Sequence, residues 1–145
     1  MEIRHALPRD IAPIAALEAE TFPLGADESA LERMRKAPNS VILCAVDGDA
    51  LLGYAYFQFV LDEGYVGDLA VCAEHRREGL GTALVNAMAD EAREKALSFL
   101  TLEVRESNLP ARRLYERCGF EIVGLRKNYY EKPAENAVLM TRTFI

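Results

Sequence analysis

The 145-residue sequence contains only two histidines, three cysteines and no tryptophan. Zinc sites and Ser-His catalytic sites are built largely from histidine and cysteine, so both kinds of site are disfavoured. The three cysteines, Cys44, Cys72 and Cys118, are far apart and lie among apolar residues. We therefore expect reduced core cysteines and no metal site.

The sequence also lacks a long apolar segment. No apolar run approaches the roughly 20 residues that cross a membrane. The N-terminal residues Met1–His5 do not have the apolar core of a signal peptide. The sequence therefore predicts a cytoplasmic protein with no membrane partner.

Basic residues are in the minority, because 17 Lys and Arg stand against 23 Asp and Glu, which gives a formal net charge of −6. Binding to a phosphate backbone needs a basic surface, so nucleic acid is disfavoured as the main partner. Net acidity is compatible with a cationic acceptor, but it equally serves solubility alone. A chain of this length, with half of its residues hydrophobic, predicts a single domain over residues 1–145.

Helical and strand patterns alternate along the whole sequence. They predict strands at 3–6, 41–46, 51–60, 66–73, 99–104, 120–125 and 138–144, and helices at 8–20, 28–36, 80–95 and 108–118. Gly119 has the position of a left-handed residue that ends a helix. The run 99–104 has no clean alternation, so we expect it to be buried on both faces. The order β-α-α-β-β-β-α-β-α-β-β predicts an α/β (α+β) fold, a mixed sheet with helices on both faces.

The stretch from Val66 to Leu84 carries the strongest functional signal. An apolar run leads into a charged turn with the pattern Arg76-x-x-Gly79-x-Gly81, and a helical period follows at once. Two glycines leave the backbone amides of the loop unobstructed, and the positive end of the helix dipole faces the same place. Such a loop binds phosphate. The spacing differs from the dinucleotide-binding pattern, and the P-loop lysine is missing.

The segments around this loop resemble a known family. Leu69–Leu84 is similar to motif A of the GCN5-related N-acetyltransferases (GNAT), and Leu102–Asn108 with Leu114–Phe120 is similar to their motif B. The pattern Leu-Glu-Val-Arg-x-Ser-Asn, followed further on by Arg126–Tyr130, resembles the RimI-type members, which acetylate the N-terminal alanine of a small-subunit ribosomal protein. The resemblance implies a mostly antiparallel sheet. It also implies direct acetyl transfer from acetyl-CoA in a ternary complex, without a metal.

The resemblance further implies which residues hold acetyl-CoA. The strand before the loop would splay from its neighbour and offer the backbone of Leu69, Ala70 and Val71 to the pantetheine arm, with an amide near Val71 polarising the thioester carbonyl. The pyrophosphate would lie on Arg77, Glu78, Gly79, Leu80, Gly81 and Thr82, with Arg76 close by. Asn108 would contact the cofactor as well as cap its helix. From the residues alone, Leu69 and Val71 also fit a core strand, and the two arginines fit a solvated turn.

Two catalytic residues follow from the same resemblance. Glu103 matches the general base, for which an ion pair with Arg105 or Arg126 is the alternative interpretation. Tyr115 matches the acid that protonates the departing coenzyme A thiolate, whereas its helical spacing alone indicates a tyrosine in the core. An α-amine has a pKa of roughly 7.7–8.0, so a base has only a modest task at neutral pH.

The acceptor pocket would be formed by two further segments. One carries Tyr129 and Tyr130, for which exposed hairpin tyrosines are the alternative, and the other carries Glu18, Phe22 and Pro23. Leu24 and Gly25 follow where many members have tryptophan, so the acceptor wall departs from the common pattern. A lysine side chain or a small-molecule amine remains an alternative acceptor. A non-catalytic acyl-CoA-binding module is a third reading, which the joint presence of Glu103 and Tyr115 disfavours.

Overall fold

The computed structural model describes residues 1–144. One seven-stranded sheet contains β1 (Glu2–His5), β2 (Ser40–Asp47), β3 (Ala50–Val60), β4 (Glu63–Val71), β5 (Phe99–Arg105), β6 (Glu121–Tyr130) and β7 (Glu135–Thr143). The helices are α1 (Ile11–Thr21), α2 (Glu28–Lys36), α3 (Leu80–Glu94) and α4 (Leu109–Arg117), with short 3₁₀ turns at Pro8–Asp10 and Ala73–His75. The predicted order of elements is confirmed. Within residues 1–144 no helix is long and apolar enough to cross a membrane.

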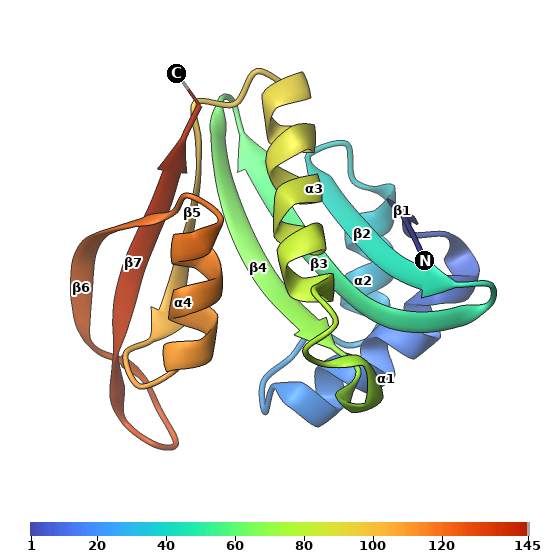
Figure 1. Cartoon of the computed structure of the whole chain (residues 1–145), viewed down its shortest axis with the longest axis horizontal. Helices are drawn as coiled ribbons and strands as arrows, with labels where there is room; N and C mark the ends of the chain where they lie inside the picture. The colour runs from blue at the N-terminus through green and yellow to red at the C-terminus, as the bar shows by residue number, and fades with distance from the viewer. Residues whose placement is uncertain (145) are drawn as a thin grey trace.

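The helices cover both faces of the sheet, as the pattern predicts (Figure 1). On one face α3 buries Leu84 and Met88 in a core that it shares with α4. On the other face α1 and α2 pack Ile14 and Leu31 against the β2–β4 part of the sheet. Full burial of one such side chain stabilises the fold by roughly 1.5–3 kcal/mol. The three cysteines are free thiols. Cys44 and Cys118 are buried as predicted, whereas Cys72 is half-buried.

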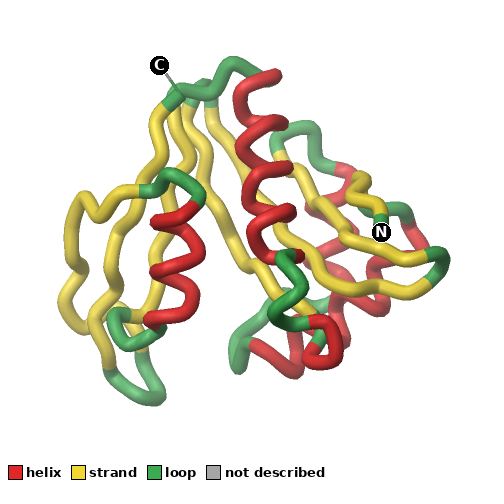
Figure 2. The backbone as a smooth tube through the Cα atoms, in the orientation of Figure 1, coloured by secondary structure: helices red, strands yellow, loops and turns green. Residues whose placement is uncertain are grey.

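The sheet opens at its centre, between β4 and β5. The strand order is β1-β2-β3-β4-β5-β7-β6, and every adjacent pair is antiparallel except β4 and β5. These two parallel strands pair only over Glu63–Tyr65 and Phe99–Thr101. Figures 1 and 2 show them side by side at one end and diverging toward the other. The predicted splay before the glycine loop is therefore present, and it leaves backbone groups of β4 without a neighbouring strand.

The structure corrects two predictions for strands that border the site. β5 is buried on one face only, because Leu100, Leu102 and Val104 face α3 and α4 while Glu103 is exposed on the other side. The helices α1 and α2 pack on β2, β3 and β4 and leave that face of β5 uncovered. β6 does not end at 125 but continues to Tyr130, because its ladder with β7 extends to the pair Tyr130–Glu135. Residues 126–130 therefore belong to a strand, not to a loop.

Candidate active site

A cleft of about 440 Å³ lies where β4, the glycine loop, α3 and α4 meet. We call it the donor cleft. Its lining includes most of the residues predicted to hold acetyl-CoA, namely Leu69, Ala70, Val71, Arg76, Arg77, Gly79, Leu80, Gly81 and Thr82. Glu78 is exposed and contacts His75 at 3.3 Å, and its side chain is absent from this lining. Residues far apart in the sequence thus form one surface around the start of α3.

A glycine is needed at each of the two positions in the loop for a different structural reason. Gly79 caps α3 with φ +82°, a left-handed conformation that favours glycine. At Gly81 a Cβ would lie 3.2 Å from Leu114 Cδ2, so the absence of a side chain lets α4 pack closely. No side chain caps the first turn of α3 among the described residues, and that turn contains no acidic residue. Its amides and the helix dipole therefore remain available to an anion.

The backbone of β4 contributes through alternate residues. Cys72 N–H donates to the Leu52 carbonyl at 2.8 Å, so in this antiparallel pair Cys72 and Ala70 direct their backbone groups toward β3. Leu69 and Val71 direct theirs the opposite way, into the opening beside β5. The prediction that Ala70 offers its backbone to the cofactor is therefore wrong, because the ladder with β3 already uses it. Leu69 and Val71 remain the residues predicted to offer their backbone.

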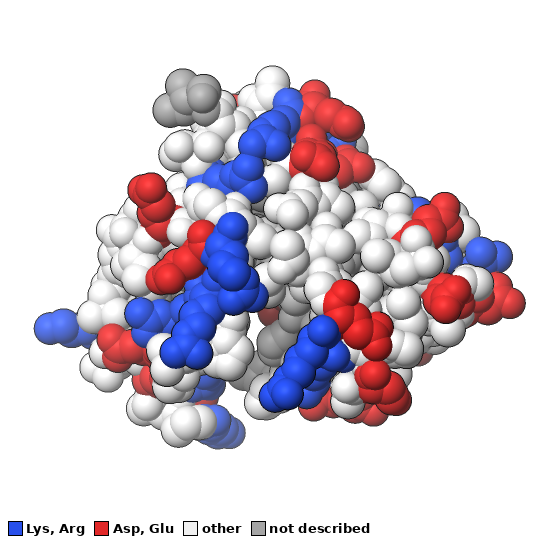
Figure 3. All heavy atoms as spheres, viewed as in Figure 1, with Lys and Arg blue, Asp and Glu red and all other residues white. Residues whose placement is uncertain are grey.

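Positive charge flanks the donor cleft in a protein that is acidic overall. Arg76 and Arg77 line it from the loop and Arg117 lines it from α4. Figure 3 shows basic side chains over α4 and over the loop before α3. The Arg76 guanidinium donates from Nε to the Val71 carbonyl at 3.3 Å, which holds the loop against the end of β4. This local charge suits a phosphate-bearing ligand.

A second cleft of about 330 Å³, the acceptor cleft, shares Thr21, Leu69 and Ala111 with the donor cleft. The two clefts therefore adjoin one another beside β4, where the sheet opens toward β5. The acceptor cleft is lined by most of the remaining predicted residues, which come from four different elements or their flanks: Phe22, Pro23, Glu103, Asn108, Tyr115 and Tyr130. The structure thus brings the predicted base and the predicted acid into one cavity.

Glu103 projects from β5 with 31% of its side chain exposed. Its Oε2 accepts a hydrogen bond from the Tyr129 hydroxyl at 3.1 Å, and its Oε1 lies 3.7 Å from Arg126 Nε. One of the two partners named by the alternative interpretation is therefore present. The other, Arg105, pairs instead with Glu135 at 3.2 Å. The carboxylate is held in place by these contacts and remains open to the cleft.

Tyr115 belongs both to the core and to the cleft. Only 7% of its surface is exposed, and its ring packs edge to face on Phe120 with the centroids 5.4 Å apart. Burial raises the pKa of the Tyr115 hydroxyl above its ordinary value, and the nearby charge of Asp68 raises it further. The hydroxyl therefore keeps its proton at neutral pH. The core interpretation from helical spacing is confirmed, and the place of Tyr115 in the lining of the acceptor cleft is compatible with the predicted acid.

Two other predicted residues have structural roles that the geometry shows directly. Asn108 is the N-cap of α4, and its side chain accepts from Ala111 N–H at 3.3 Å while it lines the acceptor cleft. Glu18 does not line the cleft, contrary to its expected place in the wall, because its side chain is fully buried. Phe22 and Pro23, which follow it, form that wall instead.

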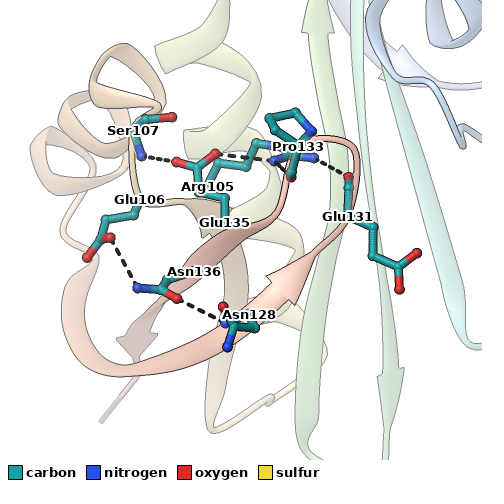
Figure 4. A network of polar contacts seen from close by, with 8 residues as sticks. All are labelled: Arg105, Glu106, Ser107, Asn128, Glu131, Pro133, Glu135 and Asn136. Carbon is teal, nitrogen blue, oxygen red and sulfur yellow. Dashed lines mark hydrogen bonds and ion pairs between the residues drawn. The ribbon is translucent and has the colours of Figure 1, made fainter.

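A polar network fixes the β6–β7 hairpin beside the cleft (Figure 4). Arg105 donates to the carbonyls of Glu131 and Pro133 at 3.1 and 3.0 Å, and Glu135 Oε2 accepts from Ser107 N–H at 2.6 Å. The Arg105 guanidinium also lies 4.4 Å from the centroid of the Tyr130 ring. Tyr129 packs on Tyr130 with the ring centroids 5.0 Å apart. Tyr129 is exposed, as the alternative interpretation expects, while Tyr130 lines the acceptor cleft.

Among the cleft residues that sequence reasoning missed are an aspartate and two arginines: Asp68, Arg105 as an organiser, and Arg117. Asp68 had a visible signal, since it is a charged residue inside an apolar strand pattern. Arg105 and Arg117 had none, because arginines in such positions are ordinarily solvated. Within residues 1–144 no group of three or more His, Cys, Asp or Glu is placed to hold a metal ion.

The family can now be stated. Residues 11–120 match the model of the acetyltransferase (GNAT) family. The chain belongs to this family. The expected resemblance is thereby confirmed, and the mixed sheet with helices on both faces is the fold of a GNAT protein.

Relatives within the GNAT family share its sequence over different lengths. The [ribosomal protein bS18]-alanine N-acetyltransferase of Haemophilus influenzae is 42% identical over 98 residues. The match covers 66% of this chain and 66% of the relative, just under two thirds of its length. A putative enzyme of the same name from Bacillus subtilis is 32% identical over 140 residues, or 95% of this chain and 92% of the relative. The crystal structure of the ribosomal-protein-S18-alanine N-acetyltransferase from Escherichia coli has a TM-score of 0.88 and 28% identity, covering 98% of this chain and 92% of that one.

Proposed function

We propose that this protein transfers the acetyl group of acetyl-CoA to the N-terminal amine of an alanine, and that its acceptor is a small-subunit ribosomal protein. One structural observation carries the proposal. The donor cleft and the acceptor cleft adjoin beside β4, where the sheet opens toward β5, with Glu103 and Tyr115 on the wall of the acceptor cleft. The names of the two relatives and of the Escherichia coli structure support the choice of acceptor. Such an acceptor would place the enzyme in the cytoplasm.

Acetyl-CoA would occupy the donor cleft. Its pyrophosphate would accept hydrogen bonds from the amides of residues 77–82 and face Arg76, Arg77 and Arg117. The pantetheine arm would lie along β4 and pair with the backbone of Leu69 and Val71, whose groups point away from β3. The same amide of Val71 would polarise the thioester carbonyl as charge develops on its oxygen. The cofactor is thus held mainly by backbone.

The reaction would proceed by direct attack of the amine on the thioester. Glu103, through a water molecule, would accept a proton from the nitrogen as the new C–N bond forms. Tyr115 would donate its proton to the departing thiolate, because a thiol with a pKa near roughly 8.5 is basic enough to take a proton in the transition state. Phe22, Pro23, Tyr129 and Tyr130 would enclose the acceptor side chain. No step requires a metal.

An acceptor comparison tests this proposal. The protein is incubated with acetyl-CoA and one of three acceptors: a peptide with a free N-terminal alanine, the same peptide N-blocked but containing lysine, or a panel of small amines. Released thiol measures turnover, and mass spectrometry locates the acetyl group. We expect turnover on the free α-amine only. Turnover on lysine or small amines alone would contradict the acceptor, and binding of coenzyme A without turnover on any acceptor would indicate a binding module.

A further inference from the structure

Two carboxyl groups lie at the wall of the acceptor cleft, one on its surface and one buried behind it. Asp68 lines the cleft, and its Oδ2 accepts a hydrogen bond from the Tyr56 hydroxyl at 3.0 Å. Glu18 lies deeper, with none of its surface exposed. Its Oε2 accepts from Ala26 N–H at 2.7 Å, and its Oε1 accepts from the Tyr54 hydroxyl. The Tyr54 ring stacks on the ring of Tyr56, the donor to Asp68, with the centroids 6.4 Å apart. The cleft thus has a carboxylate on its surface that is connected to a second, buried one.

The backbone around Glu18 is shaped for this carboxyl group. A Cβ at Gly25 would lie 2.6 Å from Glu18 Oε2, closer than two such atoms can approach. The carboxyl therefore occupies space that only a glycine leaves free.

Burial and the neighbouring Asp68 raise the pKa of Glu18 to about 7. The pair therefore gains or loses one proton close to neutral pH, near the pKa of roughly 7.7–8.0 of an α-ammonium group. The other charged and titratable groups that face the pair, from β3, β5, α4 and β6, are Tyr54, Tyr56, Glu103, Arg105, Tyr115 and Tyr130. Arg105 donates to Glu135, Glu131 and Pro133, and among the described residues it forms no ion pair with either carboxyl group.

The proposed reaction needs two proton acceptors for each amide formed. A protonated α-amine loses one proton before it attacks and a second as the C–N bond forms, while Tyr115 supplies one proton to the thiolate. Glu103 accounts for the second of the protons that leave the nitrogen. The first proton has no assigned acceptor. It matters because only roughly a tenth of α-amines are unprotonated at pH 7.

We propose that the Glu18–Asp68 pair takes up this first proton. The N–H bond of the acceptor ammonium breaks, its electron pair stays on nitrogen, and an O–H bond forms on the pair, with Asp68 facing the ammonium and Glu18 storing the proton. Glu18 acts through Asp68 and is a positioning residue. The inference rests on the proposed function and adds to it a way to bind the charged form of the amine and release the neutral nucleophile.

Two near-isosteric variants test the pair, namely Asp68→Asn and Glu18→Gln, with Asp49→Asn in the exposed β2–β3 turn as a matched control. The kcat/KM for a peptide with a free N-terminal alanine is measured at about pH 7 and about pH 9. We expect both variants to lose about fivefold to tenfold at pH 7 and less than about twofold at pH 9, where the amine is already free in solution. The KM for acetyl-CoA and the melting temperature check that the donor cleft and the fold are intact.

The pH dependence separates this role from a structural one. The inference would be overturned by a loss of activity that is as large at pH 9 as at pH 7, or by no loss at pH 7. A loss in Asp68→Asn alone would overturn the pairing with Glu18. A ¹³C-carboxyl NMR titration gives a readout without turnover. We expect the Glu18 midpoint near 7 in the native chain and lower in Asp68→Asn; an unchanged midpoint contradicts the pair. A native protein that acetylates no peptide contradicts the proposed function instead.

Discussion

The donor and acceptor clefts adjoin one another but are built in opposite ways. The donor cleft is formed mainly from the continuous stretch 69–82, and the groups that it offers to an anion are the uncapped backbone amides at the start of α3. The acceptor cleft is formed from side chains that follow α1 and that come from β4, β5, α4 and β6. Its carboxylates and tyrosines depend on long-range packing for their positions. A constant cofactor suits the first construction, while the second allows the acceptor to change by substitution of single side chains.

The largest expected effect lies on the acceptor side. Tyr115→Phe should lower kcat by about 100-fold or more, because it removes the proton donor for the thiolate. The affinity for acetyl-CoA should not change, since the ring that packs on Phe120 is retained. Steady-state kinetics and calorimetric titration with acetyl-CoA measure the two quantities. Tyr65→Phe, at an exposed tyrosine of β4, is the control. Equal turnover in Tyr115→Phe and the native chain would remove Tyr115 as the acid.

Glu103→Gln should reduce kcat by roughly 10- to 100-fold, at or below the lower end of the usual contribution of a general base, because an α-amine makes only a modest demand on the base. The amide oxygen still accepts the hydrogen bond from Tyr129, so the hairpin should stay in place. Arg126→Ala is the informative comparison, because it removes only the charged partner of Glu103. If both variants lose the same activity, Glu103 serves the ion pair rather than the chemistry.

A change on the donor side should alter binding and not the chemical step. Gly79→Ala forces a side chain into a left-handed conformation, at a cost of roughly 1–2 kcal/mol, so we expect about a tenfold higher KM for acetyl-CoA. Gly48→Ala is a matched control, because Gly48 also has a positive φ and nothing within 4 Å of a Cβ. It should destabilise the fold similarly and leave this KM unchanged. A fall in kcat alone would contradict the assignment of the loop to cofactor binding.

The contrast between the clefts also explains what could be predicted from the sequence. The donor loop was predictable because Arg76-x-x-Gly79-x-Gly81 is local, and its chemistry follows from backbone conformation. The alternation of backbone direction along β4, which excludes Ala70, needs the register with β3. Glu18 was placed in the acceptor wall, whereas packing buries it against Gly25 and Tyr54. Its link to Asp68 joins residues fifty positions apart, which no local pattern contains.

The smallest expected effect tests whether side chains contribute to the donor cleft at all. Arg117→Ala should raise the KM for acetyl-CoA by about threefold at low ionic strength, because an exposed charge facing a phosphate contributes less than about 1 kcal/mol. The effect should disappear at about 0.5 M salt, where such charges are screened. Arg113→Ala, an exposed arginine of the same helix that does not line the cleft, should have no effect. A defect that persists at high salt would mean that Arg117 shapes the cleft by packing, and the donor side would then depend on long-range side-chain contacts as the acceptor side does.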